Sequence, residues 1–403
     1  MHWRLALLQL FFTLGWTVYV IFLPGLLKRA GIDASWLLWI LIVDQLLFAA
    51  ADVACGFWLD RSKQLLRRAG NWLTALVIAS CALFILLPKI AGHAPSWLLL
   101  AVLFLWVIFS SVLRVPPLVL LTKAVAPDAS SARLATPIAA YLFGIGVAGA
   151  LAPYLTVVLK NHDPLLPFVI ASAALAAATL ALRHQLAMQT EVTIATVSRP
   201  PSAANLRGAF PLLIAVALFA FGMQLHAAVN SAKLFAAAAP GVALEWLMPL
   251  FWAGFSVAMF PASVWLAKRS EQSGDARLAS TSAMWMAGIA GGMALLACAF
   301  SPSLSLLIVL QIIAGAAWAF LFLAAISAAA DFGRTGREGS WIGTMLALFA
   351  LAAAGRIAFV LLMSGDTLPK GFSTELPSVA ALSWLIAAVM IASTKRHDER
   401  ALN

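Results

Sequence analysis

The sequence predicts an all-α polytopic membrane protein, with twelve transmembrane helices in two six-helix pseudo-repeat bundles. Three observations support this prediction. Of the 403 residues, 63% are hydrophobic and only 10% are charged, and the mean hydropathy is +0.97, a balance far from that of a soluble domain. The apolar residues form long continuous runs rather than the alternating pattern of barrel strands. The two halves of the chain also align on each other without gaps over two spans.

Each predicted span is long enough to cross a hydrocarbon core of about 30 Å, because a helix rises about 1.5 Å per residue. The second span shows the pattern, since residues 36–59 are mostly apolar and a loop rich in charged residues follows. The first run is too long for a signal peptide and lacks a small-residue cleavage site, so we interpret it as a retained span. In order, the predicted spans are 5–27, 35–59, 72–90, 97–121, 134–158, 165–183, 209–232, 243–266, 278–300, 304–330, 341–364 and 376–394.

The basic side chains indicate the orientation of the chain. With a cytoplasmic N-terminus, 18 lysines and arginines fall in cytoplasmic segments and six in outer segments, while Arg114 and Arg356 lie within spans. The positive-inside rule therefore predicts that both termini are cytoplasmic. The same distribution explains the formal net charge of +10 without a nucleic-acid partner. We expect an integral protein of a bacterial inner (plasma) membrane.

The longest polar segment separates the two halves of the chain. Residues 184–208 contain a Pro-Pro pair and lack a strong apolar stripe, which is typical of a linker. We therefore predict an N-terminal six-helix bundle over 1–183, a cytoplasmic linker over 184–208 and a C-terminal six-helix bundle over 209–403.

An internal repeat supports this division. A shift of 207 residues superposes spans one and two on spans seven and eight. The acids of the first half have no acidic counterpart, because Asp44 falls on Phe251 and Asp52 on Met259. If these acids carry an ion, coupling belongs to the N-terminal half. Identical residues that the shift brings together include Gly15 with Gly222, Trp39 with Trp246, Phe48 with Phe255, Ala51 with Ala258, and Trp58-Leu59 with Trp265-Leu266.

The loop after the second span carries a motif that reads Gly56-Phe57-Trp58-Leu59-Asp60-Arg61-Ser62-Lys63. Together with the layout of six plus six spans and the segment 336–340 between spans ten and eleven, it resembles the major facilitator superfamily. The resemblance implies alternating access, in which two bundles rock around a central substrate site lined by spans one, four, seven and ten. It also implies a gating loop made of Gly56, Asp60 and Arg61, in which Asp60 and Arg61 help to hold the cytoplasmic side closed.

Ionisable side chains within spans carry the functional prediction, because each costs a few kcal/mol or more at the bilayer centre unless it is paired or hydrated. Asp52 and Arg114 lie eight and nine residues from a cytoplasmic loop, at about 12–13 Å depth, so they are able to pair. A paired Asp52 would stay charged, whereas an unpaired one would take up protons readily. The resemblance adds that the family often has a coupling arginine in its fourth span. We assign proton coupling to Asp44, Asp52 and Arg114, with a static structural ion pair as the alternative.

A second group of polar side chains lies deeper, near the predicted interface of the halves. Asp44, Tyr19, His226 and Arg356 reach similar depths, and we interpret them as a substrate and coupling cluster. Two arginines and a histidine favour an anionic or zwitterionic substrate, since arginine binds carboxylate or phosphate through two parallel hydrogen bonds. A neutral or cationic solute fits if the acids neutralise the arginines. The predicted substrate-binding residues are Tyr19, Gln224, His226, Asn230 and Arg356.

These observations predict a secondary active transporter, a proton-coupled symporter that moves a small organic solute as a monomer in the lipid bilayer. We expect no cofactor and no metal, because the three cysteines fall within apolar spans and no metal-ligand spacing occurs. An enzyme is not expected, since no Ser/His/Asp constellation is found, and a Walker loop for ATP is missing.

Three alternatives remain open. The first is a multidrug or metabolite efflux antiporter, although the glycines of the fifth span do not match the spacing of the family's antiporter pattern. Close helix packing through small residues explains those glycines. The second is a non-transporting membrane sensor or assembly protein of the same fold, and the third is a membrane enzyme.

Overall fold

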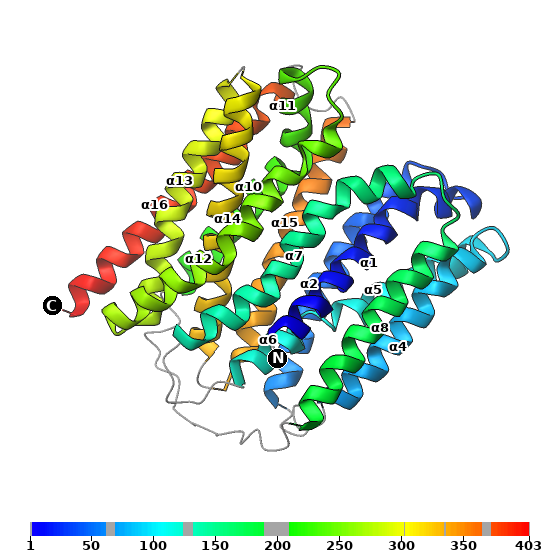
Figure 1. The fold of residues 1–403 in the computed structure, drawn as a ribbon, viewed down its shortest axis with the longest axis horizontal. Coiled ribbons are helices and arrows are strands. Elements are labelled where there is room, and N and C mark those ends of the chain that lie inside the picture. The colour runs from blue at the N-terminus through cyan, green and yellow to red at the C-terminus, as the bar shows by residue number, and fades with distance from the viewer. Residues whose placement is uncertain are drawn as a thin grey trace.

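A computed structural model describes residues 2–61, 69–123, 132–188, 209–301, 303–333, 336–364 and 372–402. Within these ranges every regular element is a helix, and twelve helical segments are long and apolar enough to cross a membrane. Figure 1 shows two groups of helices side by side, with the early helices in one group and those from α10 onward in the other. The predicted all-helical fold with twelve spans is confirmed.

The N-terminal bundle contains the first six spans, and its fourth span is split. Pro116 and Pro117 provide no amide hydrogen for a continuous helix, and a turn over 112–114 separates the two pieces of this span. Proline suits the first turn of the second piece, where an amide hydrogen would have no partner. The helices are α1 (His2–Arg29), α2 (Trp36–Arg61), α4 (Ala69–Ile90), α5 (Ser96–Ser111), α6 (Val115–Lys123), α7 (Ala132–Leu159) and α8 (Leu165–Met188).

The C-terminal bundle contains the other six spans. Its first span holds a π turn, η1, between two α-helical pieces, and its second begins with a 3-10 turn, η2. The elements are α10 (Ala209–Leu225), η1 (His226–Asn230), α11 (Ser231–Ala238), η2 (Leu244–Trp246), α12 (Pro249–Ser273), α13 (Ala276–Phe300), α14 (Leu304–Gly333), α15 (Glu338–Ser364) and α16 (Phe372–Leu402).

The expected linker overlaps the end of α8. This helix runs to Met188, so residues 184–188 are helical, while 189–208 lie outside the described residues. A tighter connection joins α12 to α13. Gly274 has a φ of +65°, a left-handed conformation that costs glycine nothing, and it ends α12. The carboxylate of Asp275 then accepts hydrogen bonds from the amides of Arg277 (2.8 Å) and Leu278 (3.4 Å), which starts α13.

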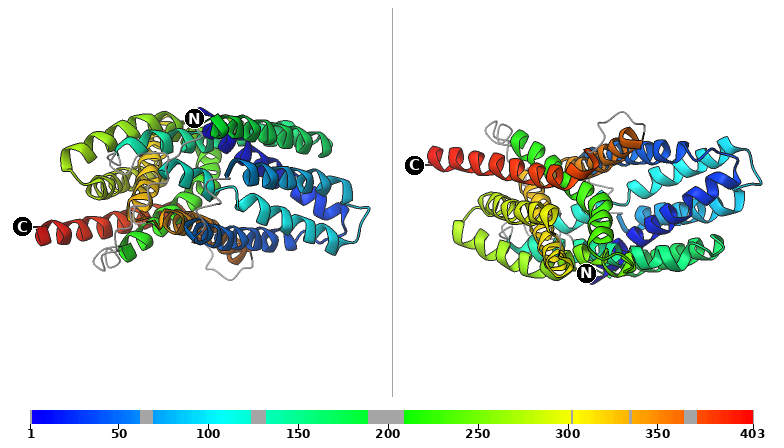
Figure 2. Two further views of the ribbon diagram at one scale, coloured as in Figure 1. Left: turned by 90° about the horizontal axis from the view of Figure 1, so that it is seen from below. Right: turned by 90° about the horizontal axis from the view of Figure 1, so that it is seen from above.

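The two bundles meet along two pairs of helices, α2 with α15 and α7 with α12. Figures 1 and 2 show α15 lying beside α2 although they belong to different halves of the chain. Glycine permits both contacts. A Cβ atom on Gly56 would collide with the carbonyl oxygen of Gly339, and one on Gly149 would collide with the ring of Trp252. Gly56 and Gly339 therefore let the backbones of α2 and α15 approach closely, whereas Gly149 of the fifth span makes room for the Trp252 ring.

Candidate functional site

Asp60, the next-to-last residue of α2, holds the first turn of α15. Its carboxylate accepts hydrogen bonds from the amides of Gly339 and Ser340, both at 2.7 Å, and from the Ser340 hydroxyl at 2.5 Å. The first amides of a helix have no partner within that helix, and its N-terminal end carries partial positive charge. A side chain of one bundle thus caps a helix of the other, and we name this interaction the gate contact. It lies at the predicted cytoplasmic end of both helices.

The gate contact depends on glycines that lie beside it. A Cβ atom on Gly339 would meet the carbonyl oxygen of Gly56 and the carboxylate of Asp60, and one on Gly343 would meet the carbonyl oxygen of Asp52. Gly56 and Asp60, two predicted gating residues, therefore lie together. Arg61 is exposed and has no hydrogen bond or ion pair with any described residue. Residues 62–68 of the motif loop lie outside the described residues.

Asp52 and Arg114 face each other within the N-terminal bundle, as their matching depths in the sequence led us to expect. The Nη1 atom of Arg114 lies 3.1 Å from Oδ2 of Asp52, and Asp52 is fully buried. Neither Asp52 oxygen has hydrogen-bond geometry to a described partner, so the contact is ionic rather than a well-aligned charge-assisted bond. The Arg114 guanidinium also lies over the ring of Phe48, 5.0 Å from its centre, which adds a cation–π attraction.

The break in the fourth span places Arg114 at this position. Its carbonyl oxygen accepts a hydrogen bond from the Tyr141 hydroxyl at 3.3 Å, and the Val112 carbonyl oxygen faces the Cys55 thiol at 3.9 Å. These side chains contact carbonyl groups that an unbroken helix would satisfy with its own amides. Polar side chains thereby stabilise an irregular turn at membrane depth, where unpaired backbone groups are costly.

Asp44 pairs with Tyr19. The Tyr19 hydroxyl donates a hydrogen bond of 2.7 Å to Oδ2 of Asp44, and both side chains are fully buried. The other carboxylate oxygen, Oδ1, has no described hydrogen-bond partner. The Tyr19 ring packs against Trp16 and Trp106, with ring centres 4.9 and 4.7 Å apart. Asp44 is thus held in an aromatic environment with half of its hydrogen-bonding capacity unused.

His226 contacts the C-terminal bundle instead. Its Nε2 lies 3.0 Å from the Oε1 atom of Gln311 on α14, and both residues are fully buried. The π turn η1 begins at His226 and ends at Asn230, which is also fully buried. Four polar atoms here have no described partner: Nδ1 of His226, Nε2 of Gln311, and Nδ2 and Oδ1 of Asn230. Unpartnered groups in a buried π turn are costly, and π turns are frequent at functional sites.

Helical register places Arg356 at the same depth as Gln311, although no hydrogen bond or ion pair joins Arg356 to any described residue. Phe349 of α15 packs against Trp318 of α14, with ring centres 6.0 Å apart. Two helical turns further along α15 is Arg356, and two turns back along α14 is Gln311. Because consecutive spans are antiparallel, both displacements run the same way, which places Arg356 at the level of Gln311 on the facing side. The Nε atom of Arg356 is buried and has no described hydrogen-bond partner.

We name His226, Asn230, Gln311 and Arg356 the polar cluster. Gln224, the remaining predicted substrate contact, is half-buried on α10, two residues before the π turn begins. Among the described residues, no hydrogen bond or ion pair joins His226 or Arg356 to the Tyr19–Asp44 pair, so the residues expected to form one cluster are not joined in this conformation. The described residues also contain no group of three or more His, Cys, Asp or Glu that could hold a metal ion.

Several solved structures share this architecture. One is a bacterial homologue of the iron transporter ferroportin in its outward-facing state, with 17% sequence identity and a TM-score of 0.66. The superposition covers 97% of this chain and 98% of the homologue's chain. The chain has the major facilitator superfamily fold. Similar values hold for the human organic anion transporter MFSD10 (TETRAN), at 16% identity, 96% and 98% coverage and a TM-score of 0.68. They also hold for the major facilitator superfamily transporter FucP in its outward conformation, at 14% identity, 97% coverage of both chains and a TM-score of 0.67.

These likenesses establish the superfamily fold and nothing finer, because the sequences are so distant. No protein-family model and no curated protein sequence matches the chain. Within the superfamily fold, the gate contact joins the second span to the eleventh, while the polar cluster belongs to spans seven, ten and eleven. A role for any of these residues therefore has to be argued from their own chemistry.

The Asp52–Arg114 pair makes a prediction for stability. Replacing Arg114 by Gln leaves a buried carboxylate without its cation, and we expect a loss of about 3 kcal/mol in the free energy of unfolding. The double variant Asp52→Asn/Arg114→Gln should be more stable than Arg114→Gln alone, because it removes the orphaned charge. Unfolding midpoints of the four proteins in detergent measure this. A double variant no more stable than either single one would show that the two side chains do not interact.

Proposed function

We propose that this protein is a secondary active transporter that moves a small organic solute by alternating access and couples that movement to protons. The gate contact is the observation that carries the proposal. It joins the two bundles through one side chain and the end of one helix, so it can break while both bundles stay folded. Within the major facilitator superfamily fold, a breakable contact at one end of the molecule is what alternating access requires.

The strength of the gate contact suits a reversible switch. Removing a side-chain cap from a helix costs about 1 kcal/mol, and each 1.4 kcal/mol changes an equilibrium tenfold. A contact of this size biases the closed state without locking it. When it opens, the amides of Gly339 and Ser340 and the Asp60 carboxylate become accessible to water, which satisfies their hydrogen bonds.

Proton coupling is assigned to Asp44 and Asp52, with Arg114 as the modulator of Asp52. Both acids are fully buried, and each has exactly one described polar partner side chain, Tyr19 or Arg114. A buried carboxylate that loses its partner binds a proton readily. The carbonyl oxygen of Asp52 faces Gly343 of α15, and Gly343 lies about one helical turn from the gate contact at Gly339 and Ser340. Movement of α15 on gate opening would therefore change the surroundings of Asp52, which links the proton to the conformation.

The polar cluster is the proposed substrate site, with an anionic or zwitterionic substrate. Arg356 keeps its charge and has no described acidic partner, whereas Arg114 is already paired. The amide nitrogens of Asn230 and Gln311 are unpartnered donors that provide further hydrogen bonds. Arg356 thus favours a carboxylate or phosphate group. One similar structure belongs to a human organic anion transporter, which supports the same choice.

Loss of the gate contact should open the predicted cytoplasmic end. Ala347 of α15 is 5% exposed and belongs to the same buried apolar cluster as Phe48 of α2. In a background without the native cysteines, we expect Asp60→Ala to raise the rate at which a membrane-impermeant maleimide labels Ala347→Cys by roughly fivefold. The control is Glu271→Gln, which removes an exposed carboxylate of α12. Equal labelling rates with and without Asp60 would contradict the gate.

Arg356 should decide which solutes bind. We expect lactate, glutamate or benzoate to stabilise the purified protein in a thermal-shift screen, where a ligand at 100 times its dissociation constant contributes about 2.7 kcal/mol. The stabilisation should vanish in Arg356→Gln and persist in Lys233→Gln, which removes an exposed cation of α11. Stabilisation only by cationic or neutral solutes, or equal shifts in both variants, would overturn the anion preference.

The acids should decide whether transport follows the proton gradient. In proteoliposomes containing a pH-sensitive dye, we expect the anion identified by thermal shift to carry protons with it across the membrane. Proton entry and accumulation of the anion inside the vesicles should both be lost in Asp44→Asn or Asp52→Asn, while the Glu271→Gln variant should retain both. Full proton-driven accumulation in both single variants would refute the assignment. Binding without any accumulation in the unaltered protein would instead support a non-transporting sensor.

A further inference from the structure

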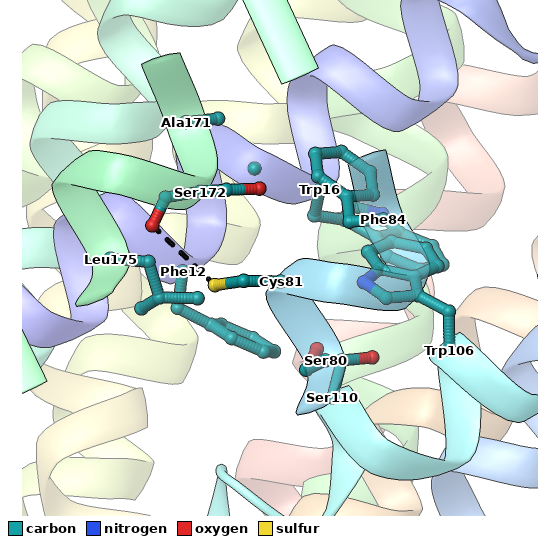
Figure 3. A pocket seen from close by; sticks show the side chains of 11 residues that line it. Phe12, Trp16, Ser80, Cys81, Phe84, Trp106, Ser110, Ala171, Ser172 and Leu175 are labelled. Carbon is teal, nitrogen blue, oxygen red and sulfur yellow. Dashed lines mark hydrogen bonds between the residues drawn. The ribbon is translucent and has the colours of Figure 1, made fainter. Parts of the chain in front are cut away.

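A cavity inside the N-terminal bundle, between α1, α4, α5 and α8, is too small for an organic solute in this conformation. Figure 3 shows that side chains from all four helices line it, among them Trp16, Cys81, Trp106 and Ser172. Its volume is about 20 Å³, which has room for a single water molecule. The recognition of a solute is therefore assigned to the polar cluster, the proposed substrate site, whose buried side chains carry unpartnered atoms.

The hydrogen bond between His226 and Gln311 determines which atoms of both side chains are free. With the Gln311 amide placed so that Oε1 faces His226, this oxygen only accepts, so Nε2 of His226 carries the hydrogen and donates at 3.0 Å. A second hydrogen, on Nδ1, would put an unpaired charge on a fully buried ring, which is costly. Nδ1 of His226 is thus an acceptor and Nε2 of Gln311 is a donor, and neither has a described partner.

Asn230 adds a second acceptor and a second donor on the same face of span seven. It lies four residues after His226 and ends the π turn that His226 begins. Residues four apart share a face of an α-helix, and the slightly wider π turn keeps them nearly aligned. Both polar atoms of the Asn230 side chain, Oδ1 and Nδ2, are buried without a described partner. The cluster therefore contains neutral acceptors as well as neutral donors.

The two acceptors distinguish between classes of solute. A carboxylate only accepts hydrogen bonds, so it suits Arg356 and the free amide nitrogens but leaves Nδ1 of His226 and Oδ1 of Asn230 unpaired. An ammonium group would donate to them, but it would bring a second positive charge to the depth of Arg356, and like charges repel strongly where water is excluded. A hydroxyl group donates and accepts without any charge, so it fits both kinds of free atom.

We propose that the substrate is a hydroxy acid, whose carboxylate faces Arg356 and whose hydroxyl groups form hydrogen bonds with His226 and Asn230. This inference rests on the proposed function, because it narrows the substrate class of the same site. A buried donor or acceptor that is left unpaired is costly, and a site built to bind a hydroxyl rejects the analogue that lacks it. An acid without the hydroxyl should therefore bind roughly tenfold more weakly or worse.

Compounds with one three-carbon skeleton test the proposal by thermal shift of the purified protein. Propionate has no hydroxyl, lactate has one and glycerate has two, while alanine has an ammonium group instead and lactamide has the hydroxyl without the negative charge. In the unaltered protein we expect the dissociation constant to fall roughly tenfold from propionate to lactate, and to fall again for glycerate. Alanine should bind no more tightly than propionate.

The variant Asn230→Leu separates recognition from folding. It replaces an amide whose side-chain atoms have no described partner by an apolar side chain of similar size. The unliganded protein should therefore unfold at the same or a higher temperature, while the preference for lactate over propionate should fall severalfold. The matched control is Gln9→Leu, which removes a buried amide of α1 in the other bundle and should keep the full preference.

Two outcomes would overturn the hydroxyl contacts. One is equal affinity of the unaltered protein for lactate and propionate, which needs no variant and would leave the anion site itself in place. The other is a preference for lactate that Asn230→Leu does not reduce. Binding of lactamide but of none of the acids would instead contradict the anionic substrate of the proposed function while upholding the hydroxyl contacts, so the two proposals can fail separately.

Discussion

The approach of α2 to α15 across glycine is the constraint on which the rest of the arrangement depends. Gly56, Gly339 and Gly343 carry no side chains, so the two backbones come close enough for Asp60 to reach the first amides of α15. The same approach brings α15 against the Asp52 carbonyl oxygen. Without these glycines, the end of one bundle could not cap a helix of the other, and the buried ion pair would lie further from the moving helix.

The two bundles treat their buried polar groups differently. In the N-terminal bundle, each of the two fully buried acids has a partner side chain, and aromatic rings pack against Tyr19 and Arg114 of these pairs. In the C-terminal bundle, the described buried polar groups include a histidine and two amides with unpartnered atoms, together with an arginine that lacks a described acidic partner. The proposed mechanism therefore places proton binding in the N-terminal half and anion binding in the C-terminal half.

The sequence was sufficient for features that depend on length and depth. Apolar run length predicted the twelve spans, and equal distances from the loops predicted that Asp52 meets Arg114. It was insufficient where tertiary contacts decide. The family resemblance implied that Asp60 acts in a gate and included the segment 336–340. Nothing in the sequence, however, shows that the amides of Gly339 and Ser340, 279 and 280 residues away, are the partners of Asp60. A single amide in an apolar span, such as Gln311, has many explanations in the sequence alone, and only the fold places it against His226.

The break in the fourth span has a mechanical consequence. Arg114 sits between α5, which packs in the N-terminal bundle, and α6, a nine-residue piece that packs against α15 of the other bundle. The two prolines after the break prevent the pieces from acting as one rigid rod. A displacement of α15 can therefore move Arg114 in two ways. It can shift the α2 backbone beside Asp52, and it can shift the short helix α6, which packs against α15 and is joined to Arg114. The Arg114 guanidinium would then move with α6, while the Asp52 carboxylate would stay with α2.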